Sequence, residues 1–135
     1  MTLIDTSAWI ELLRTNGDAQ AKRRVAAMIE LGEAAHCGPI VFELVTGARP
    51  AEMPDVREAL SFSVLLDFPT ACWERAGEVE KVLRARGVTV PRDDIFVAAA
   101  ALHHDVPILA WDSHFALMCD RGGIPLRLAA RRTWL

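Results

Sequence analysis

Short apolar runs alternate with longer segments of helical periodicity along this chain, and the alternation constrains its fold more than any other feature. The runs that predict buried or extended strands are Met1–Ile4, Ala34–Cys37, Val64–Leu66, Val88–Val90, Ile108–Ala110 and Ile124–Leu128. The segments that predict helices, mostly from apolar residues three and four positions apart, are Ser7–Arg14, Asp18–Leu31, Ile40–Val45, Asp55–Phe62, Thr70–Arg86, Asp93–His103 and Asp112–Cys119. Because parallel strands need a long crossover, usually a helix, the alternation predicts an α/β sandwich on a mainly parallel sheet.

Length and composition indicate one globular domain, residues 1–135. The chain is 52% hydrophobic and 24% charged, which excludes disordered and low-complexity proteins. No apolar run approaches the roughly 18 residues of a transmembrane helix. The first residues, MTLIDTSAW, lack the basic segment of a signal peptide. We therefore expect a cytoplasmic protein with no membrane partner.

Cysteine, proline and tryptophan positions add smaller expectations. The three cysteines are widely spaced without a CxxC motif, so we expect ordinary buried or partly buried thiols at Cys37, Cys72 and Cys119. The prolines that should frame a loop are Pro50 and Pro54. Both Trp9 and Trp73 lie at helical spacing with apolar residues and are expected in the core.

Four carboxylates recur where a strand ends or in the first turns of a helix: Asp5, Glu43, Asp94 and Asp112. In parallel α/β sheets, ligands bind outside the carboxyl ends of the strands. Each aspartate has an alternative role as a helix N-cap. This alternative fits Glu43 less well, because Glu43 lies within the apolar helix IVFELV and has no basic residue three or four positions away.

Four converging carboxylates would need a counter-charge. Two unit charges about 4 Å apart repel by roughly 4 kcal/mol at an effective dielectric constant near 20. All-oxygen ligands suit Mg²⁺ or Mn²⁺ rather than zinc, and such ions activate water and stabilise charge on a transferring phosphoryl group. Convergence would therefore imply hydrolysis of a phosphodiester with one or two bound ions.

The formal net charge of −3 does not by itself indicate a nucleic-acid-binding protein, but it does not exclude one. Candidate phosphate contacts are Arg92, Arg121, Arg131 and Arg132. The alternative for each of them is an ordinary solvated surface arginine.

Four motifs in order resemble a known family. LIDTSAWIELL, PIVFELVTGA, VPRDDIFVAAAAL and PILAWDSHF follow the order and approximate spacing found in PIN-domain ribonucleases, most closely the VapC toxins of bacterial toxin–antitoxin pairs. The resemblance spans essentially the whole chain. It implies an α/β/α sandwich and an endoribonuclease dependent on Mg²⁺ or Mn²⁺, commonly cleaving tRNA or rRNA. It also implies inhibition by a VapB-type antitoxin and assembly as a homodimer.

The resemblance also assigns roles to residues. The four family acids match Asp5, Glu43, Asp94 and Asp112, which would be catalytic and bind the metal. Asp94 is preferred to Asp93 because Val97-Ala98 follow it at the family spacing; Asp93 is then a helper or a solvated acid. The small polar residues after the first acid match Thr6 and Ser7. Ser7 either holds a metal-bound water or caps the helix. One departure is Ala110, where many members carry Thr or Ser; it bears on rate and sequence preference.

Three histidines, His103, His104 and His114, are expected on helix surfaces. His114 is also close enough in sequence to Asp112 to reach the site. One rival is a phosphatase of the haloacid-dehalogenase type, but Ser7 stands where that class needs a second Asp. A dinucleotide-binding Rossmann domain is excluded because GxGxxG is absent. The remaining alternative is a catalytically inactive PIN-like module that binds RNA or a protein partner.

Overall fold

A parallel sheet forms the centre of the computed structural model, which describes residues 1–130. Its strands run in the order β3-β2-β1-β4-β5, and every pair in this sheet is parallel. The strands are β1 (Thr2–Ile4), β2 (Ala34–Cys37), β3 (Val64–Leu66), β4 (Ile108–Leu109) and β5 (Leu128–Ala130). The predicted parallel α/β architecture is therefore confirmed.

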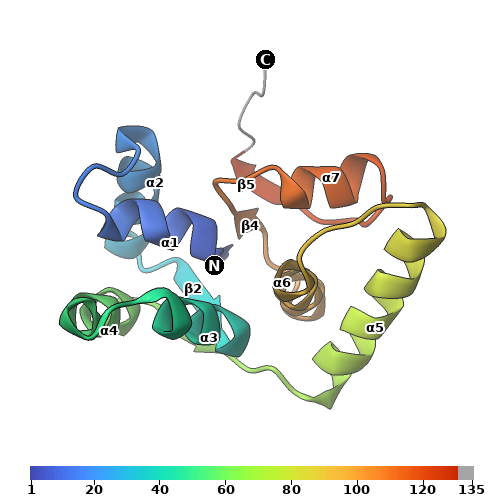
Figure 1. The fold of residues 1–135 in the computed structure, drawn as a ribbon, viewed down its shortest axis with the longest axis horizontal. Coiled ribbons are helices and arrows are strands. Elements are labelled where there is room, and N and C mark those ends of the chain that lie inside the picture. Colours follow the sequence, from blue (N-terminus) through green and yellow to red (C-terminus); the bar gives the residue numbers. More distant parts are fainter. Residues whose placement is uncertain (131–135) are drawn as a thin grey trace.

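Helices connect the strands and cover the sheet (Figure 1). They are α1 (Thr6–Leu13), α2 (Ala19–Glu30), α3 (Gly38–Gly47), α4 (Met53–Ser61), α5 (Thr70–Ala85), α6 (Arg92–His104) and α7 (His114–Asp120), with a 3-10 turn, η1, at Pro50–Glu52. In Figure 1, α6 lies near the middle of the molecule, with α5 and α7 on one side and α1 and α2 on the other. Since α6 packs against both α3 and α5, its residues Ile95 and Val97–Ala101 are buried.

The core is built on the central strands. Leu3, Ile4 and Ile108 are fully buried, and so is Trp9 on α1, as predicted. Trp73 is different, because 54% of its surface is exposed and its ring meets Phe68 and Phe96 edge to face on the outside of α5. The prediction of a core Trp73 was wrong: helical spacing identifies one face of a helix but not whether another element covers every residue of that face.

Two predicted strands differ from the structure. Val88–Val90 does not join the described sheet, because the Val88 N–H donates to the Leu83 carbonyl and closes the end of α5. The last strand begins at Leu128 rather than Ile124. Residues 124–126 form local backbone hydrogen bonds instead of pairing with a strand. The Ile124 N–H donates to the Met118 carbonyl oxygen, and the Leu126 N–H donates to the Ile124 carbonyl oxygen.

The segment around the two prolines is helical rather than a loop. Pro50 opens η1 and Pro54 lies in the first turn of α4, positions where a missing N–H costs nothing. The Arg49 N–H donates to Glu52 Oε1 at 2.8 Å and holds this entry. The thiols of Cys37 and Cys72 are buried and outside any disulfide, and the partly buried Cys119 donates its thiol to the Leu126 carbonyl oxygen at 3.6 Å, so all three are ordinary thiols as predicted. Within residues 1–130, no helix is long and apolar enough to cross a bilayer.

Candidate metal centre

The fold places the predicted acids at the carboxyl edge of the sheet. Asp5 directly follows β1, and Asp112 lies three residues after the end of β4, the strand beside β1. Glu43 comes from α3, and Asp94 lies in the first turn of α6. One side-chain oxygen from each of Asp5, Glu43 and Asp94 lies within 4.8 Å of the others. Three of the four acids predicted to form one site therefore lie together.

Asp5 is the most enclosed of these acids, with 1% of its surface exposed. It is the N-cap of α1: its Oδ2 accepts from the Ser7 N–H at 3.1 Å and from Ser7 Oγ at 2.8 Å. The other oxygen, Oδ1, is buried and has no hydrogen-bond partner in the described protein. Asp5 thus caps a helix and also presents an unpaired oxygen, so the two alternatives for this residue hold together.

Ser7 joins two sides of the site. Its Oγ donates to Asp5 and accepts from the Trp111 N–H at 2.8 Å, across 104 positions of sequence. This hydroxyl is therefore committed to fixing the Asp5 carboxylate relative to the segment after β4. The helix-capping role belongs to Asp5 rather than to Ser7, and the role of holding a metal-bound water stays a prediction.

Thr6 holds the Glu43 carboxylate in place by a hydrogen bond, as Ser7 does for Asp5. Its Oγ1 donates to Glu43 Oε1 at 3.0 Å, so the carboxylate in the apolar helix has a partner from α1. Burial raises the pKa of Glu43, the Thr6 hydrogen bond lowers it, and the charges of Asp93, Asp94 and Asp112 raise it. The neighbouring acids therefore penalise ionisation of Glu43.

His114 connects the other two acids. Its Nδ1 lies 2.6 Å from Asp94 Oδ2 and 3.4 Å from Asp112 Oδ2, and its backbone N–H donates to Asp112 Oδ1 at 3.0 Å. The His114 side chain is 38% exposed on α7 and also reaches the site, which is the alternative that its spacing from Asp112 left open. Sequence gave one clue, the two-residue spacing from Asp112, but the approach to Asp94 depends on how α6 and α7 pack.

Burial and mutual repulsion dominate the electrostatics of the site. Burial, followed by the charge of Asp94, raises the pKa of Asp5 to about 7, despite the opposing Ser7 hydrogen bonds. Burial and the charge of Asp112 raise the pKa of Asp94 to about 6, against the opposing effect of His114. The protein alone therefore does not neutralise this set of acids near pH 7.

These observations fit a divalent cation. An unpaired, buried Asp5 Oδ1 amid repelling carboxylates has the position and charge of a metal ligand. Oxygen donors dominate the set, which suits Mg²⁺ or Mn²⁺. A second combination, Asp94, Asp112 and His114, also has ligand atoms within 4.8 Å of one another.

The other predicted residues lie at or beyond the edge of this centre. Asp93 lines an apolar cleft with Phe42 and Trp73. Arg92 begins α6 and pairs with Glu80 at 3.1 Å. Arg121 follows the last residue of α7, at the opposite end of that helix from His114. Arg131 and Arg132 lie outside the described residues. The half-buried Ala110 offers no side-chain hydrogen bond to the centre.

Comparisons with known proteins agree with the motif pattern. The sequence profile of the PIN domain matches residues 2–120. Ribonuclease VapC11 of Mycobacterium tuberculosis (strain H37Rv) is 32% identical over 124 residues, covering 85% of this chain and 89% of that protein. Ribonuclease VapC21 of the same strain is 30% identical over 101 residues, covering 70% and 71%.

A solved structure has the same fold. The crystal structure of VapBC2 from Rickettsia felis, bound to a DNA fragment from their promoter, contains a chain that superposes with a TM-score of 0.76. The match covers 97% of this chain and 98% of that chain at 15% identity, and identity this low supports the fold alone. The α/β/α sandwich implied by the resemblance is thereby confirmed.

Proposed function

This chain belongs to the PIN-domain family and to its VapC branch, and from this membership we propose that it is a metal-dependent endoribonuclease acting as the toxin of a toxin–antitoxin pair. The observation that carries the proposal is the buried, unpaired Asp5 Oδ1 within a cluster of repelling carboxylates. An inactive module would gain nothing from keeping this costly arrangement.

The residues that would hold Mg²⁺ or Mn²⁺ are Asp5, Glu43, Asp94 and Asp112. One or two such ions, when bound, supply Lewis-acid stabilisation of the scissile phosphate and activation of the attacking water. This donor set is supported by the approach of Asp5, Glu43 and Asp94 within 4.8 Å of one another and by the approach of Asp112 to Asp94 within the same distance.

The surrounding side chains would orient these ligands. Ser7 holds Asp5 Oδ2 and leaves Oδ1 directed elsewhere, while Thr6 holds Glu43 Oε1. The Nδ1 of His114 engages Asp94 Oδ2, and its backbone N–H fixes Asp112 Oδ1. Fixing one oxygen of each carboxylate preserves the geometry of the site before the substrate binds, which reduces the reorganisation needed for catalysis.

RNA is the proposed substrate, because the curated relatives are named ribonucleases. We propose tRNA or rRNA as the class of target, with Arg92 and Arg121 as phosphate contacts and Asp93 as a helper acid beside Asp94. The proposed partner is a VapB-type antitoxin, since the solved neighbours include VapBC complexes, and the toxin would assemble as a homodimer.

The first test is Mn²⁺ binding by calorimetry, followed by RNA cleavage. Wild type should bind Mn²⁺, and Asp5→Asn should bind it weakly or not at all while remaining folded. Asp18→Asn is the matched control, because Asp18 caps α2 in the same way but lies outside the acidic cluster. Equal Mn²⁺ binding by wild type and Asp5→Asn, or none by either, would favour the inactive binding module instead.

Cleavage of total tRNA and rRNA would then be compared with and without Mn²⁺. The expected result is cleavage by wild type and by Asp18→Asn, and none by Asp5→Asn or after chelation. We expect a small open reading frame beside the gene for this chain, and its product should co-purify with this chain and block cleavage. Cleavage unchanged by chelation would refute metal dependence.

A further inference from the structure

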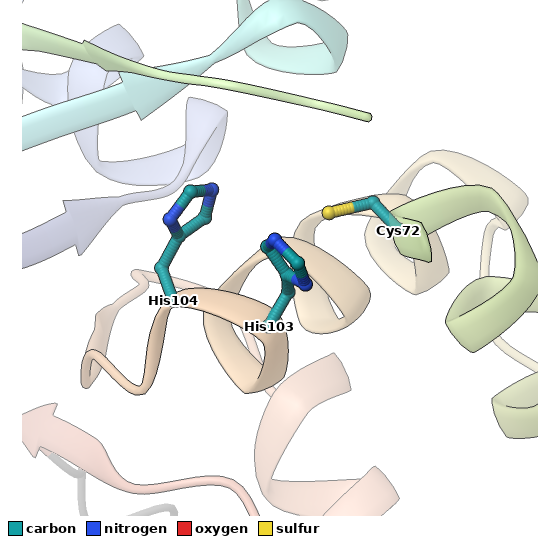
Figure 2. A group of neighbouring side chains, drawn as sticks. All are labelled: Cys72, His103 and His104. Carbon is teal, nitrogen blue, oxygen red and sulfur yellow. The ribbon is translucent and has the colours of Figure 1, made fainter. Parts of the chain in front are cut away.

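A second group of metal-binding side chains lies at the other end of α6 from the acidic cluster. One ligand atom from each of Cys72, His103 and His104 lies within 4.8 Å of the others (Figure 2). His103 is nine residues after Asp94 on the same helix, and nine residues of α-helix span about 14 Å. The two groups are therefore separate and could hold separate ions.

Packing of α5 against α6 brings these residues together. Cys72 is the third residue of α5, and the two histidines are the last two residues of α6. Figure 2 shows the Cys72 thiol pointing toward the His103 ring. The two imidazoles lie edge to face with centroids 4.8 Å apart. Sequence alone gives no sign of this group, because about 30 residues separate the cysteine from the histidines.

The local environment of each side chain suits a cation bound by a thiolate. Cys72 is free and fully buried, and burial raises the pKa of its thiol. A metal ion would offset that penalty by replacing the thiol proton, which is released to solvent. The N-terminus of α5 favours the negative sulfur, and the C-terminus of α6 favours the positive ion.

The histidines differ in how freely they can move. His103 is exposed, whereas the half-buried His104 donates from Nε2 to the Asp67 carbonyl oxygen at 2.7 Å. A tetrahedral zinc site places its sulfur and nitrogen ligands roughly 3.3–3.8 Å apart, given the usual Zn–S and Zn–N bond lengths. Side-chain rotation, mainly at the exposed His103, would bring the group to that spacing.

We propose that Cys72, His103 and His104 bind a borderline-soft transition-metal ion of the zinc type, with water completing the coordination. Sulfur and imidazole ligands select this class of ion, whereas the carboxylate cluster selects hard ions such as Mg²⁺. The site would connect the first turn of α5 to the end of α6 and stabilise that junction. It does not depend on ribonuclease activity.

Cobalt spectroscopy tests the proposal with a signal that the acidic cluster cannot produce. Co²⁺ titrated into the reduced, metal-free protein should give a near-ultraviolet thiolate-to-cobalt charge-transfer band that saturates and then disappears on addition of Zn²⁺. Asp5→Asn and Cys119→Ser should retain the band, because the first alters only the carboxylate cluster and the second removes a thiol outside the proposed group.

The ligand variants decide the outcome. Cys72→Ser should abolish the band, and His103→Ala should weaken Co²⁺ binding by more than about tenfold, since even outer partners of metal ligands cost that much. His103 is exposed, so His103→Ala should not change the melting temperature of the metal-free protein, and its result stands even if Cys72→Ser unfolds. Absence of the band in wild type, or its persistence in Cys72→Ser, would overturn the proposal, as would unaltered Co²⁺ affinity in His103→Ala.

Discussion

Replacing Asp5 with asparagine should make the metal-free protein more stable at neutral and alkaline pH. Asparagine is as good an N-cap as aspartate and can still accept the Ser7 hydrogen bonds, so the cap of α1 is preserved. What the substitution removes is a buried negative charge beside Asp94. The stability change therefore isolates the cost of that charge.

The magnitude follows from the shifted pKa. The pKa of Asp5 rises from 3.8 to about 7 in the folded protein, and one pKa unit corresponds to 1.36 kcal/mol, so ionised Asp5 costs about 4 kcal/mol of folding free energy. The sign is fixed, because the folded state binds more protons than the unfolded state between these two values. Wild type therefore loses this amount of stability progressively as pH rises from about 4 to about 7.

Urea unfolding of wild type and Asp5→Asn in the presence of chelator, at a series of pH values from 4 to 8.5, measures this difference. The two free energies of unfolding should nearly coincide at the acid end, and the variant should be more stable by up to about 4 kcal/mol at the alkaline end. Saturating Mn²⁺ should stabilise wild type and not the variant.

The control for this experiment is Asp18→Asn. Asp18→Asn also replaces an N-capping aspartate, but Asp18 lies outside the acidic cluster, so the difference between this variant and wild type should vary little with pH. If the free energies of unfolding of Asp5→Asn and wild type differ by the same amount at every pH, the charge of Asp5 does not destabilise the folded protein. Severe destabilisation of Asp5→Asn at every pH would mean that the carboxylate is purely structural.

Three further predictions concern the site and the core. Mn²⁺ affinity, measured by calorimetry, should strengthen between about pH 5.5 and 8, because Asp94 and Asp5 must lose protons from groups with pKa values of about 6 and 7 before they bind the ion; constant affinity would contradict the assignment. His114→Gln should raise the pKa of Asp94 further in an NMR titration of its carboxyl carbon, since the charge and hydrogen bond of His114 lower that pKa; an unchanged value would show that the contact is weak. In urea unfolding, Trp9→Ala should lower the free energy of unfolding by about 3–5 kcal/mol, because it truncates a buried aromatic side chain. Trp73→Ala should lower it by only about 1 kcal/mol, through loss of the edge-to-face contacts. Similar losses in the two variants would mean that Trp73 is buried like Trp9.

Much of the fold follows from local sequence signals. The ends of Ala34–Cys37 and Val64–Leu66 agree with the structure, because a short apolar run between turn residues admits little else. The position of Asp5 follows from a related argument, because a carboxylate directly after a buried parallel strand must emerge at the carboxyl edge of the sheet. Errors arose where backbone hydrogen bonds rather than apolar pattern decided the outcome, as at Val88–Val90.

The sequence by itself determined which carboxylates are candidates for the metal centre, because residue type and position relative to a strand or helix start are local properties. Only the tertiary structure decided how those residues are held. Ser7 bridges Asp5 and the segment after β4, and His114 reaches Asp94, since β1 and β4 are neighbours in the sheet and α6 packs beside α7. The order of strands and the packing of helices depend on contacts between distant parts of the chain, which no periodicity within a single segment can specify.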